Sequence, residues 1–216
     1  MKETTNTTVA DLLRDPGLCI DWAQNAQNLG GLVAFLLSVA IIGSGAFGFA
    51  LGAFAGWREA LVDALKMMGV VLFPFVLCAP TLYVFACLGG CTLKPLRLLT
   101  VGLVALAVLG CLLAALAPVL WMFAVSTESV GFIIFFACAL TAVAAHFAHR
   151  PLLCAVERKV VGSVTVLRVW FLIFLLVALQ TVTLMRPMLS PRGSSRSPQG
   201  KCFFLEHLRH SMLDAR

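Results

Sequence analysis

Between residues 29 and 185 the chain alternates long apolar runs with short polar links, and the links hold almost all of the charged side chains. A helix needs about 20 apolar residues to cross a bilayer, and it satisfies its backbone hydrogen bonds internally. The pattern therefore predicts an all-α fold, an integral membrane helical bundle with about five transmembrane helices. The predicted spans are residues 29–56, 67–88, 98–123, 130–149 and 165–185.

Polar segments flank the predicted bundle. Residues 1–28 contain several acidic side chains and precede an apolar run too long for a cleaved secretory signal, so we expect the first run to remain as a helix. Residues 186–216 form a basic tail whose first half is rich in Pro, Ser, Gly and Arg, which predicts flexibility. Residues 202–214 then predict a short amphipathic helix on the membrane surface, with a partner-docking helix as the alternative.

Composition agrees with a membrane location. The chain has 216 residues, of which 61% are hydrophobic and 12% charged, whereas soluble domains carry about 25% charged residues. The net charge is +6, but the basic residues are scattered through the links and the tail without forming a basic face. This distribution favours attraction to anionic lipid head groups over nucleic-acid binding, so the expected partner is the lipid bilayer.

The basic residues also predict an orientation. The link at 126–129 has no Lys or Arg, whereas the link at 89–97 carries two and the link at 149–163 carries three. The positive-inside tendency places these two basic links in the cytoplasm, which puts the N-terminus inside and the tail outside. The basic tail argues for the opposite side. If the second run is re-entrant, broken at Pro74 and Pro80, the N-terminus lies outside.

Small residues line one face of the first span. Ala40, Ser44, Gly48, Gly52 and Gly56 recur every four residues and therefore share a helix face. In lipid, small residues let helix backbones approach and make van der Waals contact. The face predicts either packing against another span of this chain, which we favour, or contact with a second copy or a partner protein. A Gly52→Leu substitution would separate these two interpretations.

Two prolines lie inside the second span. Pro74 and Pro80 each remove one backbone hydrogen bond and bend a helix, so this span is predicted to be kinked. Such bends shape substrate cavities in some transporters and are also tolerated in ordinary bundles. Because no charged or amide-rich site lies near them in the sequence, we favour ordinary kinks.

Sequence patterns for catalysis are weak. The segment Ile42–Gly45 is similar to the motif of intramembrane serine proteases, but that motif has glycine two residues before the serine, where this chain has Ile42. No histidine is well placed as a general base for Ser44. Metallopeptidase motifs, phosphate-binding glycine loops and paired carboxylates are also absent from the sequence. We therefore expect no catalytic residue and no cofactor.

Cysteine and histidine pairs suggest one alternative. Cys87 and Cys91 are one helical turn apart near the end of the second span. His146 and His149 are likewise one helical turn apart near the end of the fourth span. In an antiparallel bundle both pairs face the same side of the membrane, which makes a two-Cys, two-His metal or redox site geometrically possible. The remaining cysteines within the spans are typical small apolar fillers.

Several short stretches carry a resemblance: residues 64–74, 79–90 and 114–118, with Ser126 and Thr127. Over residues 60–187 the chain resembles a group of uncharacterised bacterial multi-span membrane proteins, distantly similar to the Yip family of five-span proteins. The resemblance implies a five-span architecture and no catalytic residue. The chain lacks the Asp-Leu-Tyr-Gly type signature of eukaryotic Yip members, so a trafficking role is not implied.

Together these features predict a non-enzymatic scaffold, assembly or partner-binding component of the bacterial inner membrane. One alternative is a small permease, or a transporter subunit, for a small or apolar solute. The other is the metal or redox protein with the Cys/His pairs. Polar residues around a common cavity would favour the transporter, and a dry, closely packed interior would favour the scaffold. The candidate polar residues are Thr81, Tyr83, Thr141, Gln180 and Thr183.

Overall fold

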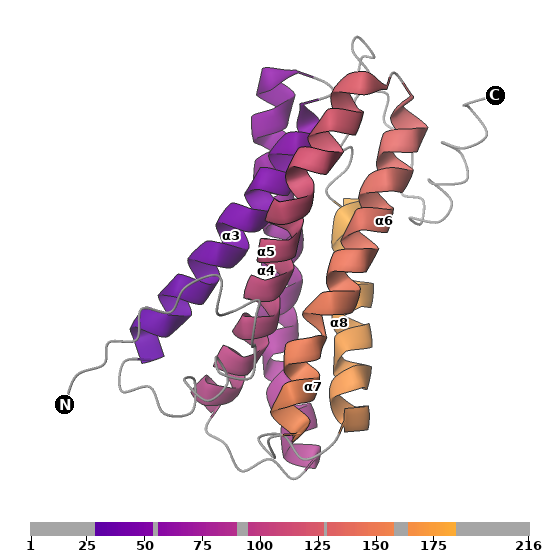
Figure 1. Ribbon diagram of the computed structural model, residues 1–216. Helices are drawn as coiled ribbons and strands as arrows, with labels where there is room; N and C mark the ends of the chain where they lie inside the picture. Colours follow the sequence, from indigo (N-terminus) through magenta and orange to yellow (C-terminus); the bar gives the residue numbers. More distant parts are fainter. Residues whose placement is uncertain (1–28, 54–55, 90–94, 128, 158–163, 185–216) are drawn as a thin grey trace.

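The computed structural model describes residues 29–53, 56–89, 95–127, 129–157 and 164–184, and these residues form six helices (Figure 1). The helices are α3 (Leu29–Gly52), α4 (Trp57–Leu88), α5 (Pro95–Ser126), α6 (Val130–Ala148), α7 (Arg150–Glu157) and α8 (Val164–Leu184). The described part of the chain contains no strand, which confirms the predicted all-α bundle. The predicted N-terminal segment and the tail with its amphipathic helix lie outside the described residues.

Four of these helices are long and apolar enough to cross a membrane. Three of these spans, Gly30–Gly52, Trp57–Leu88 and Pro95–Ser126, lie in α3, α4 and α5, and the fourth, Gly131–Leu153, runs from α6 into the start of α7. The fifth apolar run forms α8, whose apolar segment Leu167–Val182 is shorter. The 21 residues of α8 nevertheless extend over about 31 Å at 1.5 Å per residue, close to the thickness of the hydrocarbon layer. The structure is thus a helical membrane bundle in which α8 has a shorter apolar segment than the four spans.

Helix α5 lies at the centre of the bundle. It contacts α3, α4, α6 and α7, and every residue from Thr100 to Cys111 is buried. A helix that is apolar on all sides, as α5 is in this stretch, is suited to burial on all sides. The outer helices attach unequally, because α3 packs on both α4 and α5, whereas α6 packs on α5 and α8 packs on α4 (Figure 1).

The second apolar run is one continuous helix. Helix α4 extends through Pro74 and Pro80 without interruption, so the re-entrant alternative is wrong. A proline removes the single backbone bond to the residue four positions before it, and the turns on either side keep the helix together. Helix α4 also begins at Trp57, whereas the second span was predicted to start at residue 67, so residues 57–66 form its first turns.

The fourth run is interrupted close to its end. Helix α6 ends at Ala148 and α7 starts at Arg150, because Pro151 has no N–H to donate to the carbonyl of Phe147. The His149 ring contacts the His146 carbonyl, and only Nδ1–H can donate in that contact. This bond satisfies one of the carbonyl groups that a helix end leaves without a partner. After the break, Leu152 of α7 becomes buried.

Candidate functional site

The small-residue face of α3 packs against α4 of the same chain. A Cβ atom added at Gly48 would lie 2.5 Å from the Met67 Cβ and 2.6 Å from the Asp63 carbonyl oxygen. At Gly52 it would lie 2.6 Å from the Ala60 Cα. These separations are far below ordinary van der Waals contact, so only glycine permits the approach of the two helices at these positions.

The same helix makes a second backbone contact with α5. A Cβ atom at Gly110 would lie 2.7 Å from the Ala40 Cα and 3.0 Å from the Val39 carbonyl oxygen, and a Cβ atom at Gly43 would overlap the Gly110 carbonyl. Ala40 itself is completely buried. The face proposed from the four-residue repeat is therefore occupied by this chain's own helices α4 and α5.

Two members of that repeat have particular roles. Ser44 is completely buried, and its hydroxyl donates to the Ala40 carbonyl of its own helix at 2.7 Å. Gly56 does not lie on the α3 face, because α3 ends at Gly52 and Gly56 precedes α4 with φ of 135°. Side chains rarely tolerate this backbone conformation, and glycine adopts it readily. The prediction that the helix face extends to Gly56 is wrong.

The polar residues that could have favoured a permease do not share a cavity. Thr81 is exposed on α4, and its hydroxyl donates to the Cys78 carbonyl at 2.8 Å. Thr141 on α6 likewise donates to the Ala137 carbonyl of its own helix at 2.8 Å. Tyr83 and Gln180 are exposed on α4 and α8, and the side chain of Thr183 lies outside the description. No described member of the set lines the groove below.

The cysteine and histidine pairs do not form a described metal centre. Cys87 is exposed near the end of α4, and Cys91 lies outside the described residues. Within the part of the chain that the structure describes, no group of three or more His, Cys, Asp or Glu side chains could hold a metal ion. His146 and His149 instead belong to a groove between α6 and α8.

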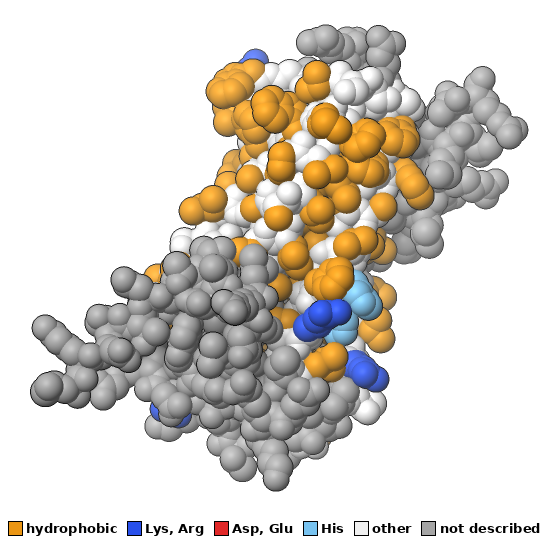
Figure 2. Space-filling model, in the orientation of Figure 1, with side chains coloured by type: hydrophobic (Ala, Val, Ile, Leu, Met, Phe, Trp, Pro, Cys, Tyr) orange, Lys and Arg blue, Asp and Glu red, His pale blue; other side chains and the backbone are white. Residues whose placement is uncertain are grey.

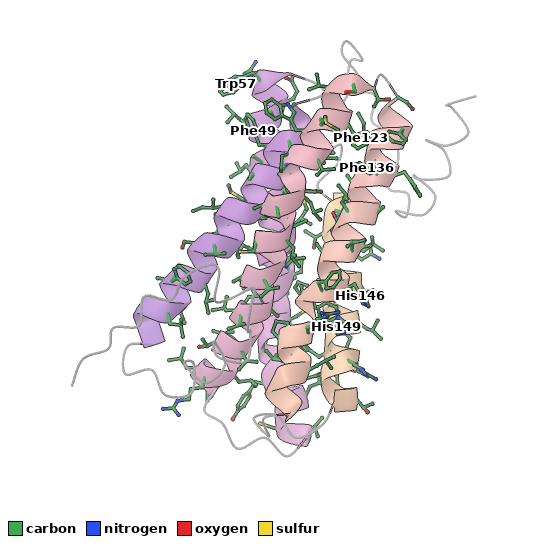
Figure 3. The ribbon with its side chains drawn as sticks, in the orientation of Figure 1. Phe49, Trp57, Phe123, Phe136, His146 and His149 are labelled. Carbon is green, nitrogen blue, oxygen red and sulfur yellow. The ribbon has the colours of Figure 1, made fainter. Side chains whose placement is uncertain are left out.

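This α6–α8 groove encloses about 500 Å³. Its walls come from the last two turns of α6, the first turns of α7 and the first half of α8. The lining residues are Ala142, Ala145, His146, His149, Leu152, Leu153, Leu167, Arg168, Phe171, Leu172 and Leu175. The volume falls within the range of about 300–1,000 Å³ that small-molecule sites occupy. In Figure 3 the labelled histidines lie together at the lower part of these helices, far from Phe123 and Phe136.

Basic and imidazole groups concentrate at one end of the α6–α8 groove. The His146 and His149 rings lie 5.2 Å apart between centroids, and the His149 ring lies 5.9 Å from that of Phe171. Arg168 is exposed at the same end, and within the described residues it makes no ion pair. The described lining contains no Asp or Glu. Figure 2 shows Lys or Arg side chains beside the histidines, below a mostly hydrophobic face.

Both main walls of the groove change from basic to apolar in the same direction. On α8, Leu172 and Leu175 follow Arg168 by four and seven residues and therefore share its face. On α6, Ala142 precedes His149 by seven residues and shares its face. Four to seven residues of helix rise about 6–10 Å, so Ala142, Leu172 and Leu175 lie one to two turns from the basic groups. Leu152, Leu153 and Leu167 also line the groove at its basic end, so the charged groups there have apolar neighbours.

The groove stays open because α8 is attached to α4. Trp170 is buried and donates its indole N–H to the Cys78 carbonyl at 3.0 Å. A buried indole N–H needs such a partner, so this bond fixes the rotation of α8 against α4. A void of about 20 Å³ adjoins the groove, shares Leu152 and Phe171 with it, and is otherwise lined by apolar residues that include Phe75 and Phe174. An apolar void of this kind stays dry.

No protein-family model, curated protein or solved structure matches this chain. The functional argument therefore rests on the chain's own residues. The sequence analysis identified His146 and His149 but grouped them with Cys87 and Cys91, and it gave Arg168 no role. The sequence did contain a signal for grouping the histidines with Arg168. In consecutive antiparallel spans, the end of α6 and the start of α8 lie at the same side of the membrane.

Proposed function

We propose that this membrane protein is a non-enzymatic assembly or partner-binding component of the bacterial cytoplasmic membrane. The supporting observation is the closed interior of α3, α4 and α5. Contacts at Gly48, Gly52 and Gly110 bring helix backbones together, and the remaining void between α4, α5 and α8 is small and apolar. A rigid, dry centre suits a protein that holds others in place.

A permease for a small or apolar solute is less well supported. Transport sites in bundles lie near the midplane and use convergent polar groups or unwound helix segments. Here α4 is unbroken at both prolines, and the hydroxyls of Thr81 and Thr141 bond to carbonyls of their own helices. The bacterial membrane in our proposal rests on the resemblance carried by residues 60–187.

We further propose that the N-terminus is cytoplasmic. Helices α3, α5 and α8 begin at the same end of the bundle, where α4 and α6 finish (Figure 1). Arg97, Arg150 and Arg168 belong to that end. At the opposite end Lys66 pairs with Asp63 at 3.1 Å. The excess of arginine supports a cytoplasmic location for the first end.

Partner contacts in this proposal lie on α6, because the small-residue face of α3 is already occupied. Only 22% of the α6 span is buried, against 56% of the α5 span, and Phe135 is 55% exposed. Phe135 and its neighbours present a large apolar surface to the membrane. Aromatic side chains of this kind contribute strongly to protein interfaces.

Affinity purification of the tagged full chain from membranes tests this function. We expect one partner protein to co-purify in fixed proportion, and Phe135→Ala to reduce its recovery. Val76→Ala is the matched control, because Val76 is 66% exposed on the lipid-facing side of a different helix, α4. If no protein co-purifies in fixed proportion after mild extraction and chemical cross-linking, the proposal is wrong.

A further inference from the structure

We propose that the α6–α8 groove binds one anionic glycerophospholipid, with its phosphate at Arg168, the rest of its polar head beside the two histidines and an acyl chain along Leu172 and Leu175. This inference is independent of the proposed partner protein. It concerns a different surface, and its measurement requires no second protein.

The polar end of the groove has the chemistry of a phosphate site. The guanidinium of Arg168 carries a permanent charge and a planar set of donors that match phosphate oxygens. Within the described residues no carboxylate neutralises it. His149 donates Nδ1–H to the His146 carbonyl, which fixes its ring, and in that neutral tautomer Nε2 is an acceptor suited to a hydroxyl of the lipid head group. Arg150 is held nearby, with its guanidinium carbon 4.6 Å from the centre of the Phe147 ring.

The apolar end of the groove suits an acyl chain. Leu172 is 65% exposed and Leu175 is 37% exposed, so both present surface to the outside of the bundle. On the facing wall Ala142 and Ala145 take little space, which provides the width between the helices. A chain seated here would contact α6 and α8 together, whereas bulk lipid touches each helix only from outside.

The direction of the groove identifies a lipid as the occupant. Arg168 lies in the second turn of α8 and His149 lies between α6 and α7, both towards the end of the bundle where α8 begins, whereas Ala142, Leu172 and Leu175 lie one to two turns further from that end. A phospholipid has this same order, with a charged head at the surface and hydrocarbon below. Basic pockets between transmembrane helices on the cytoplasmic side are suited to anionic head groups. A free phosphate would leave the apolar part of the groove unused.

Native mass spectrometry of the detergent-solubilised full chain tests the proposal. The protein is titrated with dioleoyl phosphatidylglycerol or with dioleoyl phosphatidylcholine, and the retained lipid is counted. We expect one phosphatidylglycerol per chain, bound at least about tenfold more tightly than phosphatidylcholine. Both lipids offer the same phosphate, but phosphatidylcholine would also place its trimethylammonium group beside Arg168 and Arg150, where like charges repel. Equal retention of the two lipids would overturn the proposal.

Two pairs of variants locate the lipid. Arg168→Gln should weaken phosphatidylglycerol binding by about 10- to 100-fold, whereas Arg58→Gln, at an exposed arginine of the opposite end, should leave it unchanged. Ala142→Phe fills the apolar end without changing the charge and should also weaken binding, whereas Ala139→Phe, at an exposed alanine of α6 outside the groove, should not.

The variants also distinguish the sources of phosphate. Glycerol 1-phosphate should fail to displace the lipid at millimolar concentration. Two results together would show that the phosphate group alone is bound and would overturn the acyl-chain assignment. They are displacement of the lipid by glycerol 1-phosphate and unchanged phosphatidylglycerol binding to the Ala142→Phe variant. Equal losses in Arg168→Gln and Arg58→Gln would show unspecific attraction and overturn the site itself. Circular dichroism confirms folding of each variant before titration.

Discussion

The contact between α3 and α5 provides the sharpest test of the packing. Gly110→Ala adds one methyl group that would lie 2.7 Å from the Ala40 Cα, whereas ordinary contacts begin at 3.4 Å. The shortfall is about 0.7 Å, and both obstructing atoms nearest to it belong to the α3 backbone. Backbone atoms within a helix cannot rotate out of a contact as side chains can, so the whole of α3 must move away from α5.

The magnitude follows from that displacement. A gap of about 0.5–1 Å removes a quarter to a half of the dispersion energy of each affected atom pair. Overpacking of this kind costs about 1–3 kcal/mol. Alanine is the better helix former by up to about 1 kcal/mol, which acts in the opposite direction. We therefore expect Gly110→Ala to lower the free energy of unfolding by about 1–2 kcal/mol, opposite in sign to the helix-propensity effect.

Gly102→Ala is the matched control on the same helix. Its added methyl group would lie 3.0 Å from the Phe75 Cε2 and 3.1 Å from the Leu82 Cδ2, both at the ends of side chains. Small rotations relieve such contacts, so we expect a change within about 0.5 kcal/mol. Unfolding in mixed micelles with increasing dodecyl sulfate, followed by circular dichroism, measures both variants. If Gly110→Ala proves as stable as Gly102→Ala, the close backbone contact is refuted.

Three further substitutions test other contacts. Gly52→Leu places a side chain into the α4 backbone and should destabilise the folded monomer by about 3 kcal/mol in the same micelle assay; loss of an oligomer with an unchanged monomer would contradict this. Trp170→Phe removes the bond to the Cys78 carbonyl and should cost about 0.5–1.5 kcal/mol in the same assay, so an unchanged value argues against that bond. Ser129→Ala removes the N-terminal cap of α6, which accepts from the Phe132 N–H, and should cost about 0.5–1 kcal/mol; helicity that persists unchanged on heating would contradict it.

The ends of the helices were largely predictable from the sequence. The fourth run was predicted at 130–149, and α6 covers Val130–Ala148. Length and apolarity are strong signals, because the bilayer sets the length of each span. The error at the start of α4 has the same origin. Charged residues such as Asp63 and Lys66 suggested a separate link, but a helix that extends beyond the hydrocarbon layer accommodates them in its first turns.

Lateral neighbours were not predictable in the same way. Apolar runs contain no information on which helices touch, because lipid tails are as apolar as the side chains and helices gain no hydrophobic free energy by pairing. The histidines were therefore assigned to the cysteines that also lie at a helix end, whereas the structure places them beside Arg168. The repeat of small residues had a similar limit. The repeat identified a packing face on α3. It did not indicate that this face would contact Ala60 of α4 and Gly110 of α5.

Small residues serve opposite purposes in the two halves of this bundle. Gly48 and Gly110 are covered by a neighbouring backbone and remove all space between α3, α4 and α5. Ala142 and Ala145 face a helix that does not close on them, because the Trp170 bond attaches α8 to α4 rather than to α6. The space that they leave can therefore be filled without separating the central helices. A lipid in the α6–α8 groove, as proposed, would touch α6 and α8 without displacing α3, α4 or α5, so the backbone contacts at Gly48 and Gly110 should be the same with and without it.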